Sequence, residues 1–483
     1  MTDNLNTSQF HSVHLHEEDC KGCTICVTGC PAEAIRVRDG KAHIIEEKCI
    51  DCGECIRRCP NKAKYANSNE LSDLELFARR AALIAPAVYA QFNLHYTTEQ
   101  IHEAFKSIGF TDVVDVSPDA LSVSRATAKL FESGRPLPKP LISSSCPTVI
   151  KLIEVRFPAL IDNILPLLPP VEICARRVRR QIEKELKPGE RLGIFFISPC
   201  PAKITVARSP VGYDATALTG AFSFANLYLP LITKLREIRD EQKKKVAALQ
   251  QSEKLAAVQK ADASSAARLL ENENTAVPDG LTWGRESGEA EYVARYLSHP
   301  ERFCWITSCG IKQIIETLEG IENGEYSCYD FAEIAACSGG CLGGPLMIKA
   351  ISESGAHMRM RIRERAAASE KACEDLDPDA IALSKDIAPR PARQLSTDFG
   401  QARRMMEQLE EIAAQLPGLD CGSCGAPNCR ALAEDIVRKQ AHLEDCVTIM
   451  KARYEELLFG KKKKKMSGTE NPEKDNEHDN DRQ

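Results

Sequence analysis

Hydrophobic residues in the middle of the chain come in short runs separated by amphipathic stretches. The run at 82–88, Ala-Leu-Ile-Ala-Pro-Ala-Val, indicates a strand that is buried on both faces and opens a new domain. From there to about Lys349, short apolar strands alternate with amphipathic helices, which is the pattern of an α/β fold with a largely parallel sheet. Two clear strands, Pro140–Ser143 and Arg191–Ile197, each lead directly into a cysteine motif. We therefore expect these cysteines on loops at strand ends, where α/β folds build their sites.

The segments on either side of this central domain, 78–357, have different patterns. Residues 14–66 predict a small ferredoxin-like α+β domain with a hairpin around Asp39-Gly40, and a polar helical stretch follows from Ser68 to Ala81. Residues 396–460 predict a small, mostly helical module. The remaining segments are polar: an N-terminus at 1–13, a charged helical insertion at 236–280, a linker at 358–395 and a disordered tail at 461–483.

The composition is that of a soluble globular protein. With 483 residues, 43% of them hydrophobic, the chain can form two to four domains with a sizeable core. Its net charge of −6 gives no overall attraction for nucleic acid or membranes. The first 19 residues lack a signal-peptide core, and no stretch of 18 apolar residues occurs, so we expect a cytoplasmic protein without a membrane span. In that reducing compartment, dense cysteine usage indicates metal binding rather than disulfides.

Eight cysteines near the N-terminus form two copies of one motif. Each copy reads C-x2-C-x2-C-x3-C-P, the bacterial two-cluster ferredoxin spacing, in which three thiolates bind one [4Fe–4S] cube and the fourth crosses to the other. Zinc could use the same thiols, but three close ligands per copy and the Cys-Pro ending favour iron–sulfur. On this pattern the first cluster takes Cys20, Cys23, Cys26 and Cys59, and the second takes Cys30, Cys49, Cys52 and Cys55.

Four cysteines near the C-terminus form a second group of candidate ligands. They are Cys421, Cys424, Cys429 and Cys446, and four thiols in this arrangement could also hold a tetrahedral zinc ion. The phrase at 420–433, Asp-Cys-Gly-Ser-Cys-Gly-Ala-Pro-Asn-Cys-Arg-Ala-Leu-Ala, resembles the small four-cysteine [4Fe–4S] domain of several anaerobic electron-transfer proteins. That resemblance implies a third cube rather than zinc.

The middle of the chain carries four more cysteines in three short motifs. These are Ser143-Ser-Ser-Cys-Pro147, Pro199-Cys-Pro-Ala-Lys203 and Glu333-Ile-Ala-Ala-Cys-Ser-Gly-Gly-Cys-Leu-Gly-Gly-Pro345. No disulfide scaffold or zinc finger uses four thiols with such wide spacing and these flanking residues. The motifs therefore indicate a redox-active metal site with clusters on either side of it along the chain.

Over residues 14–350 the chain resembles an [FeFe] hydrogenase. The family's signatures are usually T-S-C-C-P, P-C-x-x-K and E-x-M-A-C-x-G-G-C-x-G-G-G, and Ala85-Pro-Ala-Val88 and Tyr329-Asp-Phe331 also match. The resemblance implies an H-cluster, a fourth [4Fe–4S] cube joined through a thiolate to a two-iron subsite with carbonyl and cyanide ligands. Lys203 would donate to a cyanide ligand. The cube would be held by Cys146, Cys200, Cys337 and Cys341, with Cys341 bridging to the two-iron subsite.

The chain departs from the family pattern around the proton path. Ser145 stands where the first cysteine of the usual Cys-Cys pair passes protons, and a serine hydroxyl ionises far less readily than a thiol with a pKa of about 8.5. The family's two methionines correspond to Ser198 and Ala335. The glutamate after the second motif falls near Val206, and the acidic residues of another helix are replaced in Leu121–Lys129. The ligands are kept while the proton path is lost.

These departures resemble the sensory branch of the family, group D. The resemblance implies a low-activity, hydrogen-sensing hydrogenase (H2 = 2 H+ + 2 e−) that passes electrons between the H-cluster and the other cubes. Its partners would be H2 and protons, a redox partner protein, and a signalling partner such as a kinase, a phosphatase or a regulator. The alternative is a non-enzymatic electron-transfer or iron–sulfur assembly protein with only a cube at the central site. Ser145 and the missing methionines fit both hypotheses.

Overall fold

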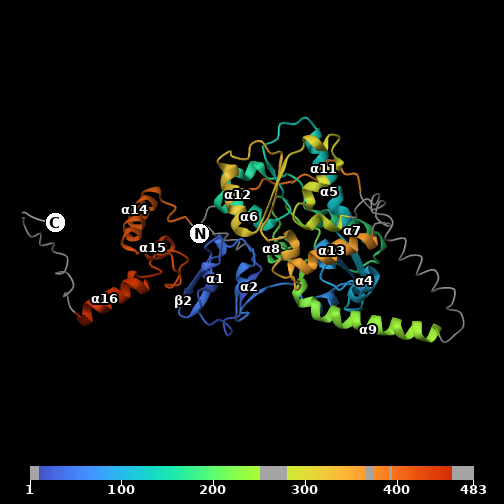
Figure 1. Ribbon diagram of the computed structural model, residues 1–483, viewed down its shortest axis with the longest axis horizontal. Coiled ribbons are helices and arrows are strands. Elements are labelled where there is room, and N and C mark those ends of the chain that lie inside the picture. Colours follow the sequence, from blue (N-terminus) through green and yellow to red (C-terminus); the bar gives the residue numbers. More distant parts are fainter. Residues whose placement is uncertain (1–9, 251–279, 366–373, 391–393, 460–483) are drawn as a thin grey trace, which may run out of the picture. The chain divides into compact units, whose positions relative to one another are not determined.

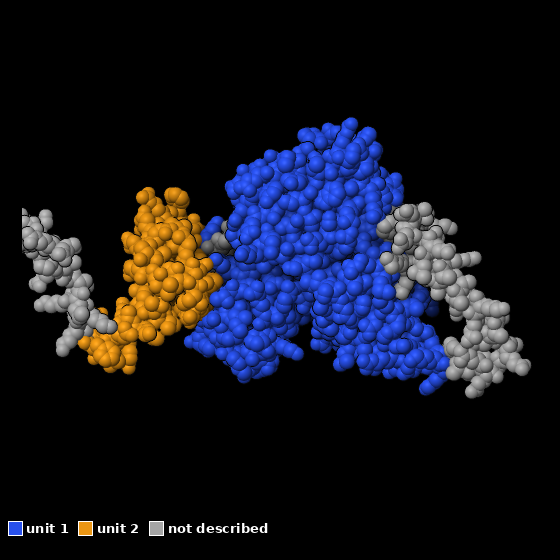
Figure 2. Space-filling view, in the orientation of Figure 1, with its two compact units in different colours: residues 1–394 blue, residues 395–483 orange. Residues whose placement is uncertain are grey.

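The computed structural model describes residues 10–250, 280–365, 374–390 and 394–459. It divides into two compact units, Met1–Gln394 and Leu395–Gln483 (Figure 2). The predicted tail, most of the predicted insertion and most of the polar N-terminus lie outside the described residues. Among the described residues, no helix combines the length and the apolar run that crossing a bilayer needs.

The N-terminal region of the first unit has the predicted ferredoxin-like α+β character. A hairpin of β2 and β3 turns at Asp39 and Gly40, whose φ angles of 52° and 73° are the left-handed pair that a two-residue hairpin needs. Strands β1 and β4 pair antiparallel and bring the two ends of the region together. The elements are β1 (Val13–Leu15), α1 (Ile25–Thr28), β2 (Ile35–Arg38), β3 (Lys41–Ile44), η1 (Glu46–Lys48), α2 (Glu54–Arg58) and β4 (Lys64–Ala66).

The central region contains two parallel sheets, where the sequence pattern predicts one. The first has the strand order β6-β5-β8-β9 and the second has the order β10-β11-β7. Every pairing within them is parallel, so the carboxyl ends of each sheet's strands share an edge. The strands are β5 (Arg79–Ile84), β6 (Asp112–Asp115), β7 (Leu141–Ile142), β8 (Leu192–Ser198), β9 (Gly220–Ser223), β10 (Trp305–Cys309) and β11 (Phe331–Ala335).

Helices cover these sheets because the central strands are buried on both faces (Figure 1). All seven residues of β8 are buried, as are the last four of β5. The α-helices are α3 (Pro86–Tyr89), α4 (Thr98–Ser107), α5 (Ser117–Glu132), α6 (Pro147–Arg156), α7 (Pro170–Ile182), α8 (Pro201–Val206), α9 (Phe224–Gln250), α11 (Gly288–Tyr296), α12 (Ile311–Glu322) and α13 (Ile351–Arg365). The 3-10 helices are η2 (Leu71–Leu76), η3 (Pro158–Asn163), η4 (Glu183–Glu185), η6 (Leu281–Gly284), η7 (Pro300–Arg302), η8 (Gly340–Gly343) and η9 (Pro378–Ile381).

Two segments differ from the sequence prediction. The helix predicted from Ser68 to Ala81 is reduced to η2, because Arg79 already belongs to β5 and pairs across the sheet with Asp112. The linker predicted from residue 358 begins inside α13, where Met358 and Arg361 are buried. Arg361 donates hydrogen bonds to three backbone carbonyls, those of Phe92, Asn93 and Tyr96, so a polar sequence is accommodated in the core.

The second unit is mostly helical, as predicted. Its helices pack around a small apolar cluster that contains Leu409, Leu416 and Leu432. The elements are α14 (Phe399–Gln415), α15 (Cys429–Val437), η10 (Leu443–Asp445) and α16 (Val447–Phe459).

Candidate metal centres

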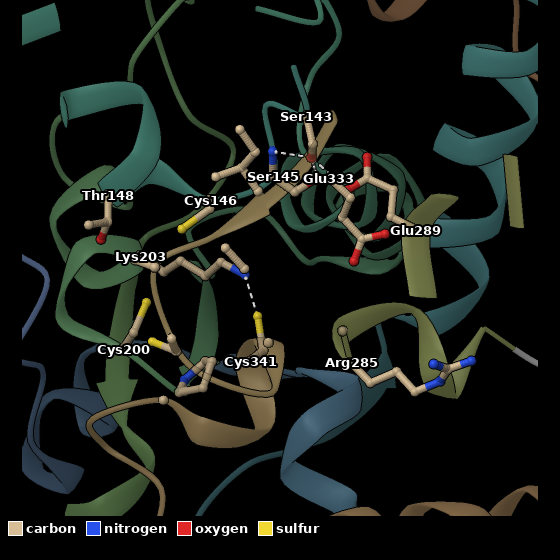
Figure 3. A pocket seen from close by; sticks show the side chains of 18 of the residues that line it. Ser143, Ser145, Cys146, Thr148, Cys200, Lys203, Arg285, Glu289, Glu333 and Cys341 are labelled. Atoms are coloured by element: carbon tan, nitrogen blue, oxygen red, sulfur yellow. Dashed lines mark hydrogen bonds between the residues drawn. The ribbon is translucent and has the colours of Figure 1, made fainter. Parts of the chain in front are cut away.

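A cavity of about 650 Å³ lies where strands of both parallel sheets end, and all four predicted central cysteines line it. Cys146 comes four residues after β7, Cys200 two residues after β8, and Cys337 two residues after β11. Cys341 follows on η8. Figure 3 shows Cys146, Cys200 and Cys341 gathered around Lys203. Three motifs far apart in the sequence therefore meet at one place.

Local structure explains why these loops can hold a bulky group. Cys146 and Cys200 each precede a proline that starts a helix, α6 and α8, so both cysteines stand at helix N-termini. Gly340 has a φ of 70°, and a Cβ there would lie 2.7 Å from the carbonyl oxygen of Gly284. Only glycine lets the loop between Cys337 and Cys341 pass this close to its neighbour.

The electrostatics of the cavity suit a cationic metal cluster. Burial raises the pKa of the Cys200 thiol to about 12 and raises the pKa values of Cys146 and Cys337 as well. These three buried thiols would therefore stay protonated without a positive partner, and bound iron supplies that charge. Burial alone would lower the pKa of Lys203, but the nearby thiolates, above all Cys341, outweigh it and hold the pKa above its ordinary value. Its Nζ lies 3.6 Å from the Cys341 sulfur.

A second cavity of about 490 Å³ adjoins the first. Cys341 and Lys203 line both cavities, so they stand at the junction. The rest of the second wall is mainly apolar, with the residues Ala85, Pro86, Ala87, Val116, Ala120, Pro169, Pro170, Val171 and Phe196. The site thus offers a thiol-lined space and an apolar space on either side of one cysteine and one ammonium group.

Ser145 lines both cavities and is hydrogen-bonded to a buried acid. Its hydroxyl donates to the Glu289 carboxylate at 3.0 Å, and the Ser143 hydroxyl donates to the same oxygen at 2.6 Å. Burial raises the pKa of Glu289 to about 7, against the opposing hydrogen bonds of the two serines. Glu333, which accepts from the Ala290 amide at 2.8 Å, has a pKa raised well above its ordinary value by burial and by Glu289. These groups can carry a proton at neutral pH.

Sequence reasoning missed Glu289. Glu333 belongs to the third cysteine motif, but Glu289 lies on α11 and meets Ser145 only through the fold. One signal was present, because Glu289 shares a helix face with buried Val293 four residues later. An acid on the apolar face of a helix is expensive to bury and suggests a function.

The other positions that depart from the family pattern are structural. Ser198 is buried and caps the loop by donating to the Cys200 carbonyl at 2.8 Å. Val206 packs in an apolar cluster, and Ala335 lines the cavity wall. On α5, Ser124 accepts a hydrogen bond from the Trp283 indole at 2.9 Å, and Trp283 itself lines the cavity.

The N-terminal cysteines surround two further cavities. One of about 300 Å³ is lined by Cys20, Cys23, Cys26 and Cys59, and one of about 340 Å³ is lined by Cys30, Cys49, Cys52 and Cys55. These are the two sets that the ferredoxin spacing predicts. Lys64 is buried in the wall of the first, and no atom of the described residues accepts a hydrogen bond from its Nζ. A buried ammonium needs an anionic neighbour, which a thiolate-bound cube supplies.

The second of these cavities adjoins the central one. Cys52 lines both. The two regions are also packed tightly, since a Cβ on Gly53 would lie 2.8 Å from the side chain of Pro345, and Arg57 donates to the Gly343 carbonyl at 2.5 Å. A cluster held by Cys52 would therefore be the nearer of the two to the central site.

The C-terminal cysteines are only partly gathered. Cys446 is buried in the apolar cluster of the second unit, and Cys424 and Cys429 pack against it. Cys421 is exposed, and its thiol pKa is lowered by hydrogen bonds with Ser423. Three of the four predicted ligands share one cluster, and the fourth lies on the surface loop beside them.

Comparisons with known families match three regions of the chain. The family described as iron only hydrogenase large subunit, C-terminal domain, matches residues 79–345. A 4Fe-4S dicluster domain matches residues 12–60, and an Fe-S cluster domain matches residues 416–448. Each matched region contains one of the three groups of patterned cysteines.

Individual relatives are more distant. An uncharacterised protein of Methanocaldococcus jannaschii is 39% identical over 51 residues, which are 11% of this chain and 23% of that protein, so the chain spans about a quarter of this curated relative. Two variants of the [FeFe]-hydrogenase HydA1 from Chlamydomonas reinhardtii are 16% and 17% identical, with TM-scores of 0.42 and 0.41. The alignments cover 67% and 66% of this chain and 98% and 99% of those chains.

Proposed function

From the premise that this chain belongs to the iron-only hydrogenase family, we propose that it is a hydrogenase of low turnover that senses H2. One observation carries the proposal. The four-cysteine site is complete at the junction of two cavities, while the residue in the proton-delivering position is Ser145, hydrogen-bonded to Glu289. The site can hold the metal group but has a slow proton donor.

The residues present fit an H-cluster. Cys146, Cys200, Cys337 and Cys341 would hold the [4Fe–4S] cube in the larger cavity, and the two-iron subsite would lie beyond Cys341 in the apolar cavity. When bound, this group supplies the interconversion of H2 with two protons and two electrons. The protein supplies an apolar pocket that excludes water, so charges within it interact strongly.

Lys203 is the charged group that orients ligands at this junction. It is held in its ammonium form by the thiolates around it and reaches the Cys341 sulfur. An ammonium suits an anionic diatomic ligand, because it offers several hydrogen-bond donors and a full positive charge. Lys203 would therefore fix the two-iron subsite in place rather than exchange protons.

Protons would pass between the cavity and the two buried acids. Ser145 takes up a proton from the cavity side only as it gives its own hydroxyl proton to the Glu289 carboxylate, 3.0 Å away. Ser143 holds the same carboxylate oxygen and lies 3.0 Å from the Ser145 oxygen, so it keeps the acceptor in position. Glu333 favours its protonated form because burial and the charge of Glu289 raise its pKa. The hydroxyl is the slow step, because it must exchange both protons together, whereas a thiol with a pKa of about 8.5 can lose one before it takes up the other.

Slow turnover suits a sensor, whose task is to report H2 rather than to carry flux. Electrons released at the central site would pass to the N-terminal cubes and to a redox partner. The C-terminal four-cysteine region would hold a further cube. A kinase, a phosphatase or a transcriptional regulator would read the state of these clusters.

A second candidate function is electron transfer or iron–sulfur assembly with only a cube at the central site. It is favoured by Ser198 and Ala335, which leave the two-iron subsite without its usual methionine contacts. The apolar cavity beyond Cys341 favours the first candidate, because an electron-transfer protein has no use for it.

Turnover of the matured protein tests the sensory assignment. The full chain is loaded with iron and sulfide and then with a synthetic two-iron cofactor, and H2 uptake is measured anaerobically. Uptake should be measurable but far slower than that of a family member with a cysteine at the position of Ser145. Uptake as fast as that of such a member would overturn the sensory assignment.

A further inference from the structure

The two N-terminal cysteine motifs differ at one buried position that the internal repeat makes equivalent. Counting five residues from the last cysteine of each motif leads from Cys30 to Ile35 and from Cys59 to Lys64. The backbones agree, since the residues two positions earlier, Glu33 and Lys62, have φ angles of 52° and 54°. Ile35 begins β2 and Lys64 begins β4. The same place in the fold thus carries an aliphatic side chain in one copy and a lysine in the other.

Both side chains are buried and each faces a different cysteine set. Ile35 is 2% exposed and lines the cavity of Cys30, Cys49, Cys52 and Cys55. Lys64 is 3% exposed and lines the cavity of Cys20, Cys23, Cys26 and Cys59. One cavity therefore has an apolar wall where the other has an ammonium group.

The Lys64 ammonium has no counterpart among the described residues. Its Nζ is inaccessible to water and makes no hydrogen bond. An uncompensated buried charge strongly destabilises a folded protein. A negative group must therefore lie beside the Lys64 ammonium in the functional protein. Burial raises the pKa of the Cys26 thiol to about 11, and the charge of Lys64 opposes that shift. The ammonium thus stabilises negative charge in this cavity.

We propose that Lys64 raises the reduction potential of the cube held by Cys20, Cys23, Cys26 and Cys59 above that of its partner cube. The inference rests on the proposed function, which assigns cubes to both cysteine sets. Accepting one electron adds one negative charge to a cube, and a nearby positive charge favours the more negative state. A single electron in this domain therefore rests on the first cube.

The position of the first cube determines in which direction this difference in reduction potential drives electrons. Cys52 of the other set lines the central cavity, whereas Ile25, between Cys23 and Cys26, is 46% exposed on the surface. Each H2 oxidised releases two electrons, and each cube takes one. The first electron passes through the first cube to an external one-electron acceptor protein, and the second electron then rests on the reoxidised first cube. The ammonium thus draws electrons outward from the central site, as reporting on H2 requires.

A second charged departure from the repeat is already compensated. Asp51 stands where the first copy has Gly22, close to Cys49. Its carboxylate accepts from Lys151 at 2.6 Å and contacts His11 at 3.0 Å, so its field is largely cancelled. Glu54 also lines the cavity of Cys49 but is paired with Arg57 and Arg58, and Lys21, which lines the other cavity, is exposed. Among the described residues, Lys64 is therefore the buried, unpaired charge that distinguishes the two cavities.

Redox titration of the full chain, monitored by electron paramagnetic resonance before the two-iron cofactor is added, tests the inference. In Lys64→Met one cube's midpoint should fall by at least about 59 mV, a tenfold shift in its reduced-to-oxidised ratio. The partner cube's midpoint should fall less, because the charge of Lys64 also acts on Cys55 but Lys64 lines only the first cavity. The reciprocal change Ile35→Lys should raise the midpoint of a different cube. Lys62→Met removes an exposed charge from the same loop and should move no midpoint.

Iron content separates failure of this inference from failure of the proposed function. If the chain binds about 16 cube irons and neither Lys64→Met nor Ile35→Lys moves a midpoint, the inference is overturned while the ligand assignment stands. If the N-terminal cysteines bind zinc or no metal, the ligand assignment itself fails. If the Lys64→Met protein does not fold, Ile35→Lys still tests the inference, because it is an independent variant.

Discussion

The hydroxyl of Ser145 and the carboxylate of Glu289 are joined by a 3.0 Å hydrogen bond at the edge of the central cavity (Figure 3). They lie 144 residues apart in the chain. The bond connects the cavity to a buried carboxylate whose pKa is raised to about 7 by burial, against the opposing hydrogen bonds.

Glu289→Gln should lower H2 oxidation by about 100-fold, because general acid–base groups contribute on the order of 10²–10⁴-fold. The amide keeps a hydrogen bond to Ser145 but cannot accept its proton. Initial rates of H2 uptake by the matured protein measure the effect. Glu301→Gln, at an exposed acid, should leave the rate unchanged. Equal rates for Glu289→Gln and wild type would remove Glu289 from the proton path.

The pH profile should report the same group. Because the pKa of Glu289 is raised to about 7 by burial, its carboxylate form is lost as the pH falls below that value. Only the carboxylate can accept a proton from Ser145, so H2 oxidation should fall on the acid side of pH 7. Rates measured at fixed H2 pressure across this range give the apparent pKa. The step should vanish in Glu289→Gln, and a step that persists there must come from another group.

Ser145→Cys should increase turnover in both directions by about tenfold or more. A thiol with a pKa of about 8.5 exchanges a proton far more readily than a serine hydroxyl, and it can use the same Glu289 partner. Ser144→Cys is the matched control, since the Ser144 hydroxyl donates to the Leu167 carbonyl and is not part of the cavity wall. A gain in both variants would point to a general effect of added thiols.

The buried ion pair of Lys151 and Asp51 should stabilise the contact between the N-terminal and central regions. Burial alone would raise the pKa of Asp51, but the His11 hydrogen bond and the Lys151 charge outweigh it and hold the pKa well below its ordinary value. Lys151→Met leaves this buried carboxylate with His11 as its remaining partner and should lower the free energy of unfolding by about 3 kcal/mol.

Anaerobic urea unfolding measures this loss. Arg135→Met breaks the exposed pair of Arg135 and Asp379 and should leave the free energy of unfolding nearly unchanged, because water screens this pair. Similar losses in the two variants would mean that burial adds nothing to the Lys151–Asp51 pair.

The parts of the site that could be predicted from the sequence are those determined by residues close together in the chain. The N-terminal cysteines are spaced so closely that each set of three must meet, and the strands β7 and β8 were visible as apolar runs ending in cysteine motifs. The α/β class follows from the alternation of strands and helices. The division into two sheets could not be predicted from local sequence, because strand order depends on pairing between distant segments.

Contacts between distant segments could not be predicted for the same reason. Glu289 is placed by α11, and nothing near Ser145 in the sequence points to it. Arg361 looks like part of a polar linker, yet it is buried because backbone carbonyls of the loop around Asn93 accept its hydrogen bonds. In both cases the fold satisfies a charged group with partners more than 140 residues away.

Infrared spectroscopy of the matured full chain tests the central claim most directly. If the site holds an H-cluster, iron-bound carbon monoxide and cyanide should give sharp bands in a region free of protein absorption. Cys341→Ser should abolish them, because Cys341 lines both cavities and would be the ligand that joins the two-iron subsite to the cube. Cys446→Ser should keep them and change only the C-terminal cluster. Bands that depend on Cys341 are the predicted result, and a chain loaded with its cubes that shows no such bands would contradict the account.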